Sequence, residues 1–134
     1  METKVRKTDK EWKSILNKTQ YDILRKRGTE RPFTGKYWNN HEKGIYHCAG
    51  CGQALFKSEH KYDSGCGWPS YDRPFNPEAV IEKDDRSHGM NRTEILCSNC
   101  LGHLGHVFND GPLNTTGNRF CINSGALEFK PSKS

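Results

Sequence analysis

The sequence predicts a mainly β protein whose strands run antiparallel, with short helices at the N-terminus and a four-cysteine zinc site that ties the fold together. Beyond residue 28, glycines and prolines alternate with short runs rich in β-branched and aromatic residues, a pattern typical of antiparallel strands. Four of the six cysteines fall into two Cys-x-x-Cys pairs. Because only 32% of the residues are hydrophobic, the hydrophobic core is expected to be small and to need further stabilisation, such as a bound metal ion.

The N-terminal segment, residues 1–28, predicts two short amphipathic helices that pack through one face. The first spans residues 9–17 and begins with a capping box, Thr8 followed three residues later by a glutamate. The second begins after Thr19 and ends at Gly28, after a basic turn that suits the helix dipole. Apolar residues at helical spacing form the inner faces: Trp12, Ile15 and Leu16, then Tyr21 and Leu24.

A single domain is expected over residues 1–134, since no stretch has the composition of a linker. After the helical segment, residues 29–129 form the predicted β domain, and residues 130–134 are expected to be a frayed tail. Runs with strand character occur at 45–48, 80–83, 93–97, 105–108, 119–124 and 126–129.

The formal net charge of +5 is concentrated near the N-terminus. Residues 1–31 hold ten Lys or Arg against five Asp or Glu, whereas residues 32–134 hold eleven of each. A nucleic-acid-binding protein is expected to carry a basic stripe on its main body, so this distribution argues against one. No apolar run reaches the length of a signal peptide or a membrane span, which predicts a cytoplasmic protein with reduced thiols. Six cysteines there indicate metal binding and catalysis rather than a disulfide scaffold.

The two Cys-x-x-Cys pairs are separated by 45 residues and predict about one structural zinc ion per chain. A tight turn lets both sulfurs of a pair reach one ion, and two such turns complete a tetrahedral site with no open position for catalysis. His47 and His103 are close in sequence and are rival ligands, although four thiolates already fill the site. The predicted ligands are Cys48, Cys51, Cys97 and Cys100.

The two remaining cysteines, Cys66 and Cys121, predict a redox site. In a strand over 119–124, side-chain alternation places Arg119, Cys121 and Asn123 on one face. A guanidinium beside a cysteine favours the reactive thiolate, and the Asn123 amide can donate to an oxygen held near the sulfur. Cys66 lies in a turn-rich loop, where it is either a second thiol that resolves the oxidised Cys121 or a bystander.

Two imidazoles and a carboxylate follow the second cysteine pair within eight residues: His103, His106 and Asp110. In a regular strand His103 and His106 would point to opposite faces, so both serve one site only if Gly105 marks a bulge or kink. Trp68, in the loop that carries Cys66, is well placed to line a pocket.

At these residues the chain resembles the B-type methionine sulfoxide reductases, which reduce the R epimer of methionine sulfoxide. The resemblance covers nearly the whole chain and departs from the family pattern only conservatively, at Phe120 and Ile122. The motifs that carry it occur in order at 28–33, 46–52, 55–56, 64–70, 97–108 and 119–124.

The resemblance implies a fold and a role for each candidate residue. The fold is two antiparallel β-sheets with the N-terminal helices packed against them. Cys121 matches the catalytic cysteine, Cys66 the recycling cysteine, and Trp68 the aromatic that contacts the methyl group of the substrate. The polar active-site residues of the family are matched by His103, His106, Asp110, Arg119 and Asn123.

The resemblance also implies a reaction. Cys121 attacks the sulfoxide and becomes a sulfenic acid, Cys66 condenses with it to a disulfide, and thioredoxin reduces that disulfide. The expected substrates are oxidised proteins, with free methionine sulfoxide left open. The expected state is a monomer without specific nucleic-acid or membrane partners.

Two other functions compete with this interpretation. A zinc-ribbon module that binds nucleic acid would suit the four cysteines and a pI of about 8.9, but leaves Cys121 and its polar face unexplained. A zinc hydrolase would need an open metal position, usually with His or carboxylate ligands.

Overall fold

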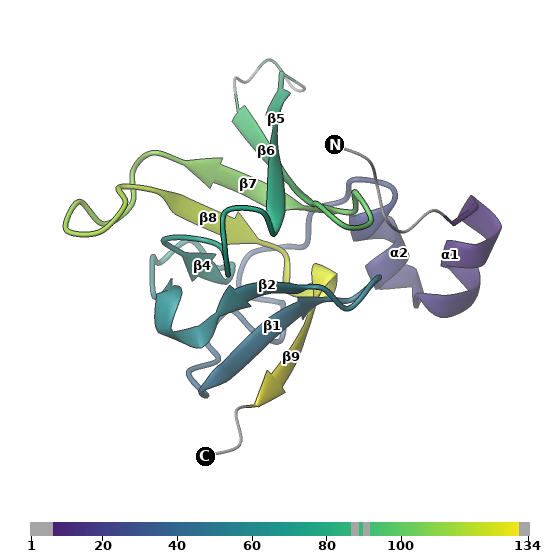
Figure 1. The fold of residues 1–134 in the computed structure, drawn as a ribbon, viewed down its shortest axis with the longest axis horizontal. Helices are drawn as coiled ribbons and strands as arrows, with labels where there is room; N and C mark the ends of the chain where they lie inside the picture. Colours follow the sequence, from purple (N-terminus) through teal and green to yellow (C-terminus); the bar gives the residue numbers. More distant parts are fainter. Residues whose placement is uncertain (1–6, 87–88, 90–91, 132–134) are drawn as a thin grey trace.

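Two antiparallel β-sheets pack against each other, with two short helices at one end (Figure 1). This computed structural model describes residues 7–86, 89 and 92–131. The predicted mainly β class, with two antiparallel sheets and two short helices, is confirmed. No helix in this described part of the chain is long and apolar enough to cross a membrane.

The two helices form where capping is predicted, but one cap differs. Helix α1 (Asp9–Ile15) begins with the predicted capping box, in which the Thr8 hydroxyl accepts from the backbone N–H three residues later at 3.2 Å. Helix α2 (Lys18–Leu24) is capped by Asn17, whose side chain accepts from the N–H three residues later at 2.8 Å. The start predicted after Thr19 is therefore wrong, because Asn17 already provides a complete capping box.

Both helices end earlier than the sequence pattern predicts. Helix α2 stops at Leu24 instead of Gly28, because Arg27 adopts a left-handed backbone with φ of 58° and Gly28 donates back to a carbonyl of α2 at 2.8 Å. Ile15, predicted for the inner stripe, is 54% exposed, since α1 ends there. The other residues of the predicted inner faces are buried: Trp12, Leu16, Tyr21 and Leu24.

The smaller sheet has the strand order β2-β1-β9 and consists of β1 (Gly44–Cys48), β2 (Ala54–Lys57) and β9 (Leu127–Pro131). Strand β9 extends beyond its predicted end. Lys130 pairs with Ile45 and Pro131 pairs with Gly44, so these two residues belong to the sheet and not to a frayed tail. Residues 132–134 of the predicted tail lie outside the described residues.

The larger sheet has the strand order β3-β4-β8-β7-β6-β5. Its strands are β3 (Lys61–Tyr62), β4 (Ser70–Tyr71), β5 (Val80–Asp85), β6 (Arg92–Cys97), β7 (His103–Phe108) and β8 (Arg119–Ile122). The sequence pattern does not predict β2, β3 or β4. Strands β3 and β4 have only two residues each, which is too short to show alternation. The strand predicted over 119–124 ends at Ile122, where a short 3-10 turn (Ser124–Ala126) follows.

Aromatic side chains from both sheets fill the space between them. Phe56 of β2 stacks on Tyr71 of β4 with ring centroids 4.2 Å apart, and Tyr46 of β1 lies 5.4 Å from the same ring. Phe120 of β8 joins this group at 6.1 Å from Phe56. Because Phe120 points into the core, strand alternation turns its neighbour Cys121 to the opposite face of the sheet.

Strands β7 and β8 approach closely at Gly105, which pairs with Ile122. A Cβ atom at residue 105 would lie 2.0 Å from the carbonyl oxygen of Cys121 and 3.0 Å from the Cα atom of Ile122. Glycine is therefore required beside the strand that carries Cys121.

We expect Gly105→Ala to lower the free energy of unfolding by about 2 kcal/mol, because the added methyl group forces β7 away from β8. Urea unfolding measures the change. Gly117→Ala is the matched control: its φ is 75° and nothing lies within 4 Å of an added Cβ, so only backbone strain remains. That strain costs about 1 kcal/mol. Equal urea midpoints for the two variants would contradict the close approach at Gly105.

Candidate active site and metal-binding site

Two cysteine turns, one from each sheet, bring four sulfur atoms together. The sulfurs of Cys48 and Cys100 are 3.7 Å apart, those of Cys51 and Cys97 are 3.5 Å apart, and all four lie within 4.8 Å of one another. A tetrahedral zinc ion with bonds of about 2.3 Å needs sulfurs roughly 3.8 Å apart, so these donors fit such an ion. Sequence spacing and structure agree on a cluster of four cysteines that could hold a metal ion.

The two turns share one backbone arrangement. Gly52, with φ of 84°, follows the first pair and donates its N–H to the carbonyl of Cys48 at 2.9 Å. Leu101, with φ of 61°, follows the second pair and donates to Cys97 at 2.8 Å. The ring of His47, a predicted rival ligand, instead bonds the Gly52 carbonyl at 3.0 Å. Both turns therefore present their sulfurs in the same way without help from an imidazole.

The N-terminal segment packs over these turns. Arg25, just after α2, donates to the carbonyl of Cys100 at 3.1 Å and lies 4.7 Å from the ring centroid of Trp12. Leu24 lies against Gly102, where an added Cβ would be 2.9 Å from the Leu24 side chain. The packing of the helices thus depends on correctly folded cysteine turns.

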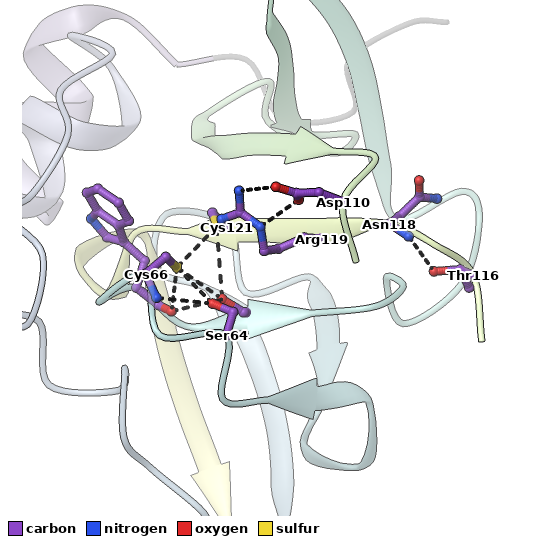
Figure 2. A network of polar contacts seen from close by, with 9 residues as sticks. Ser64, Cys66, Asp110, Thr116, Asn118, Arg119 and Cys121 are labelled. Carbon is purple, nitrogen blue, oxygen red and sulfur yellow. Dashed lines mark hydrogen bonds and ion pairs between the residues drawn. The ribbon is translucent and has the colours of Figure 1, made fainter. Parts of the chain in front are cut away.

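The second site is built around a pair of free thiols. Cys121 comes from β8 and Cys66 from the loop between β3 and β4, and their sulfur atoms are 3.3 Å apart (Figure 2). The Cys66 sulfur also contacts the hydroxyl oxygens of Ser64 at 3.0 Å and Ser70 at 3.3 Å. The structure therefore brings together the two cysteines that the metal cluster does not use.

Arg119 lies beside this pair, on the same face of β8 as Cys121. Its Nη1 atom donates to the Cys121 sulfur at 2.7 Å, while Nε and Nη2 donate to the two carboxylate oxygens of Asp110 at 2.8 and 3.1 Å. The guanidinium also lies 4.6 Å from the ring centroid of Phe108. Figure 2 shows the chain of contacts from Asp110 through Arg119 to Cys121. The guanidinium is thus held against the sulfur by a bidentate ion pair and an aromatic ring.

The two sulfurs compete for one negative charge. The hydrogen bond from Cys121 lowers the pKa of Cys66 to about 4, and the hydroxyls of Ser64 and Ser70 act in the same direction. The same contact, together with burial, raises the pKa of Cys121. Arg119 acts in the opposite direction on the pKa of Cys121. The hydrogen bond between the thiols therefore favours the charge on Cys66, whereas the Arg119 guanidinium favours it on Cys121.

A bulge in β7 brings both imidazoles to one side. Gly105 pairs with Ile95 of β6, but His103 pairs with the very next residue of β6, so Leu104 is left over on β7. The rings of His103 and His106 consequently lie edge to face with centroids 5.5 Å apart. The bulge that the sequence requires near Gly105 for a shared site is present.

Each imidazole is held by a buried carboxylate. His103 Nδ1 donates to Glu94 at 2.6 Å, and His106 Nε2 donates to Asp85 at 2.7 Å. Arg27 donates to both oxygens of Glu94 at 3.0 and 3.1 Å and lies 3.7 Å from Asp85. Burial lowers the pKa of His103 although Glu94 opposes this, so His103 is neutral near pH 7 with its Nδ1 proton on the carboxylate side.

Sequence reasoning misses these three residues, Arg27, Asp85 and Glu94. Glu94 pairs with His106 across β6 and β7 but bonds His103, so even the register of the predicted hairpin would have assigned it the wrong imidazole. Arg27 offers no signal in the sequence, because its contact with Glu94 depends on how the end of α2 packs against the larger sheet.

A cavity of about 290 Å³ opens over the thiol pair. The indole N–H of Trp68 donates to the carbonyl of Glu30 at 3.0 Å, and the Glu30 N–H donates to the Asn123 side chain at 2.9 Å, so one peptide segment holds both. Asp110 and His103 do not line the cavity themselves. Asp110 binds Arg119, and the His103 ring lies against the His106 ring; Arg119 and His106 are lining residues. The predicted site residues that line the cavity are Cys66, Trp68, His106, Arg119, Cys121 and Asn123.

Comparisons with known proteins point to one family. The SelR domain matches residues 16–131. Two relatives carry the name peptide methionine sulfoxide reductase MsrB. The one from Agrobacterium fabrum is 59% identical over 128 residues, covering 96% of this chain and 94% of the relative. The one from Chromohalobacter salexigens is 54% identical over 133 residues, covering 99% of this chain and 100% of the relative.

One solved structure, the Mis18 "Yippee-like" domain, shares the fold at 17% identity. Its TM-score is 0.55, and the match covers 69% of this chain and all of that domain. At this level of identity the likeness concerns the fold alone.

We expect one thiol of the Cys66–Cys121 pair to react with iodoacetamide well below pH 8. A pKa of about 4 makes Cys66 a thiolate at neutral pH, so the alkylation rate should stay nearly constant between about pH 6 and 8. Peptide mass mapping assigns the label. In Cys66→Ser, which removes the contact that raises the pKa of Cys121, the label should appear on Cys121. A rate that rises roughly tenfold per pH unit over this range, as for an ordinary thiol, would contradict the shared charge.

Proposed function

This chain belongs to the SelR-domain family of B-type methionine sulfoxide reductases, and we propose that it reduces the R epimer of methionine sulfoxide in oxidised proteins to methionine. One observation carries the proposal: the Cys66 and Cys121 sulfurs lie 3.3 Å apart at a cavity, with the Arg119 guanidinium 2.7 Å from the Cys121 sulfur. A nucleophilic thiol, a resolving thiol and a fixed cation are the groups that thiol-dependent reduction requires.

In the first step the Cys121 thiolate attacks the sulfur atom of the sulfoxide and forms a bond to it. The oxygen gains a proton and is transferred to the Cys121 sulfur as the S–O bond and the new S–S bond to the substrate break, so that methionine leaves and Cys121 becomes a sulfenic acid. Two electrons pass from the thiolate to the sulfoxide. Substrate entry would separate Cys121 from Cys66, and Arg119 then favours the Cys121 thiolate.

Polar side chains would bind and protonate the sulfoxide oxygen. We assign oxygen binding to His103 and Asn123, and a share of the acid role to His106. The Nε2 atom of His103 is buried and has no hydrogen-bond partner within the residues described. Because the Nδ1 proton faces Glu94, Nε2 would accept from a water that in turn donates to the substrate oxygen. Trp68 would offer an apolar wall to the methyl group. The S–O bond would then fit only at the polar side chains and the methyl group only at Trp68, so the site would accept one epimer.

In the second step Cys66 resolves the oxidised nucleophile. The Cys66 thiolate attacks the sulfenic sulfur of Cys121, an S–S bond forms, and the hydroxyl leaves as water after taking a proton. The lowered pKa of Cys66, about 4, supports this role because the thiolate is the attacking form. A thioredoxin-like dithiol would then reduce the disulfide.

We propose zinc as the ion of the cysteine cluster, about one per chain, because four thiolates in a tetrahedral set suit that metal. Cys48, Cys51, Cys97 and Cys100 would hold it, and a closed four-sulfur site would supply structural support only. The zinc-hydrolase alternative needs an open position that such a site does not offer. A monomeric protein in the reducing cytoplasm, without specific nucleic-acid or membrane partners, fits the two reduced active-site thiols.

Incubation with the separate sulfoxide epimers tests the activity. With dithiothreitol as reductant, we expect methionine from the R epimer and only background from the S epimer. Cys121→Ser should abolish turnover without changing the melting temperature, because a hydroxyl is a far poorer nucleophile and residue 121 is not a metal ligand. Equal turnover of both epimers would refute the proposed selectivity, and substantial turnover by Cys121→Ser would remove Cys121 from its role.

Elemental analysis of protein purified without added metal tests the metal site. We expect about one zinc per chain in the parent and a marked loss in Cys51→Ser, together with a lower melting temperature, since structural zinc contributes roughly 10–16 kcal/mol to folding. Cys66→Ser is the matched control, because Cys66 is also a half-buried free cysteine but lies outside the cluster. A well-folded parent protein without metal would contradict the assignment of zinc to the cysteine cluster.

A further inference from the structure

Cys66 and Arg119 stand between two cavities. The first is the substrate cavity of about 290 Å³, which both cysteines line. The second has a volume of about 520 Å³ and lies between residues 62–66 and residues 110–112, the turn after β7. Cys66 and Arg119 line both cavities, whereas Cys121 lines only the first. An approach to Cys66 through the second cavity therefore comes from the side away from Cys121.

A thiolate that reduces the disulfide by attacking Cys66 must approach from the side opposite Cys121. In thiol–disulfide exchange the attacking sulfur bonds to one sulfur of the disulfide while the other leaves as a thiolate on the opposite side. Attack on Cys66 through the second cavity expels Cys121 as a thiolate, and the nearby Arg119 guanidinium stabilises that charge. The second thiol of the reductant then attacks the reductant sulfur in the mixed disulfide and releases Cys66. The dithiol thus gives up two electrons and two protons and leaves as a disulfide.

An apolar side chain stands next to this cavity. Leu113 follows Pro112, a lining residue, and at 91% exposure it is the most exposed large hydrophobic residue in the described part of the chain. Its loop is held in place: the Gly117 N–H donates to the Pro112 carbonyl at 2.8 Å, and the Thr116 hydroxyl donates to the carbonyl of Asp72. Leu113 is therefore presented to solvent from an anchored position beside the Cys66 cavity.

The acidic groups at this cavity already have partners. Asp63 contacts the His41 ring at 3.1 Å, and Asp110 is bound by Arg119. A molecule that docks here consequently meets an apolar side chain and internally paired charges. Its complement is an uncharged, apolar surface, and the association should depend little on salt.

We propose that the second cavity, together with Leu113, is the docking surface for the protein that reduces the Cys66–Cys121 disulfide. The partner is a dithiol protein whose reactive cysteine is surrounded by apolar surface. This proposal rests on the proposed function, which supplies the disulfide. Substrate and reductant then reach the thiol pair through separate openings.

The test compares two reductants in two matched variants. Leu113→Ser removes the apolar side chain, and Ile15→Ser makes the same kind of change at an exposed residue on α1. We expect Leu113→Ser to raise the KM for thioredoxin about tenfold, because the lost side chain no longer becomes buried on docking. Turnover with dithiothreitol should be unchanged in both variants, and Ile15→Ser should leave the KM for thioredoxin unchanged. Raising the salt concentration should alter that KM less than twofold.

The outcomes separate the docking surface from the activity. Equal KM values for thioredoxin in Leu113→Ser and Ile15→Ser would overturn the docking surface while the function stands. Turnover with dithiothreitol but none with thioredoxin in the parent protein would also overturn it. A parent protein that yields no methionine from the R epimer with either reductant would overturn both proposals.

A trapping experiment tests the direction of attack. Oxidised parent protein is mixed with thioredoxin that lacks its second active-site cysteine, so that the mixed disulfide accumulates. Peptide mass mapping should place the cross-link on Cys66, and Leu113→Ser should reduce its rate of formation relative to Ile15→Ser. A cross-link on Cys121 would show that the reductant enters by the substrate cavity and would overturn the proposal.

Discussion

Four sulfur atoms tie the two sheets together, and the rest of the structure depends on that tie. Cys48 ends β1 in the smaller sheet, and Cys97 ends β6 in the larger one. Thiolates within 4.8 Å of one another repel each other unless a cation lies between them. The proposed ion would convert that repulsion into an attraction of roughly 10–16 kcal/mol, which is similar to the whole net stability of an ordinary domain. A chain with 32% hydrophobic residues can therefore keep two small sheets packed together.

The thiol site derives its geometry from the same region. Strand β7 begins three residues after Cys100, and its next neighbour β8 carries Cys121, which pairs with His106. The bulge at Leu104 turns both imidazoles to one side, and Gly105 lets the two strands come close enough for that pairing. The cysteine turn and the candidate active site thus share a single strand, so an ion bound at one end would help to determine where the imidazoles lie relative to Cys121.

Sequence patterns predict those parts of this molecule whose geometry is set by residues close together in the chain. A Cys-x-x-Cys turn presents both sulfurs to one point, and alternation in β8 places Arg119 beside Cys121. Sequence patterns fail where contacts with an element distant in the chain determine burial, strand formation or hydrogen bonding. Ile15 fits a helical stripe but lies at the end of α1. The two-residue strand β4 pairs with β8, and β3 pairs in turn with β4. Asp85 and Glu94 escape notice because their partner imidazoles come from another strand.

The thiol pair explains how a buried nucleophile can stay protected until its substrate arrives. A thiolate buried without partners has a raised pKa and is costly to form. In the resting site the Cys121 thiol and the hydroxyls of Ser64 and Ser70 lower the pKa of Cys66, and the contact between the two thiols raises the pKa of Cys121. On the proposed mechanism, a sulfoxide that displaces Cys66 removes the group that keeps Cys121 protonated, and Arg119 becomes the dominant neighbour. On this mechanism the Cys121 thiolate becomes easier to form when substrate occupies the cavity.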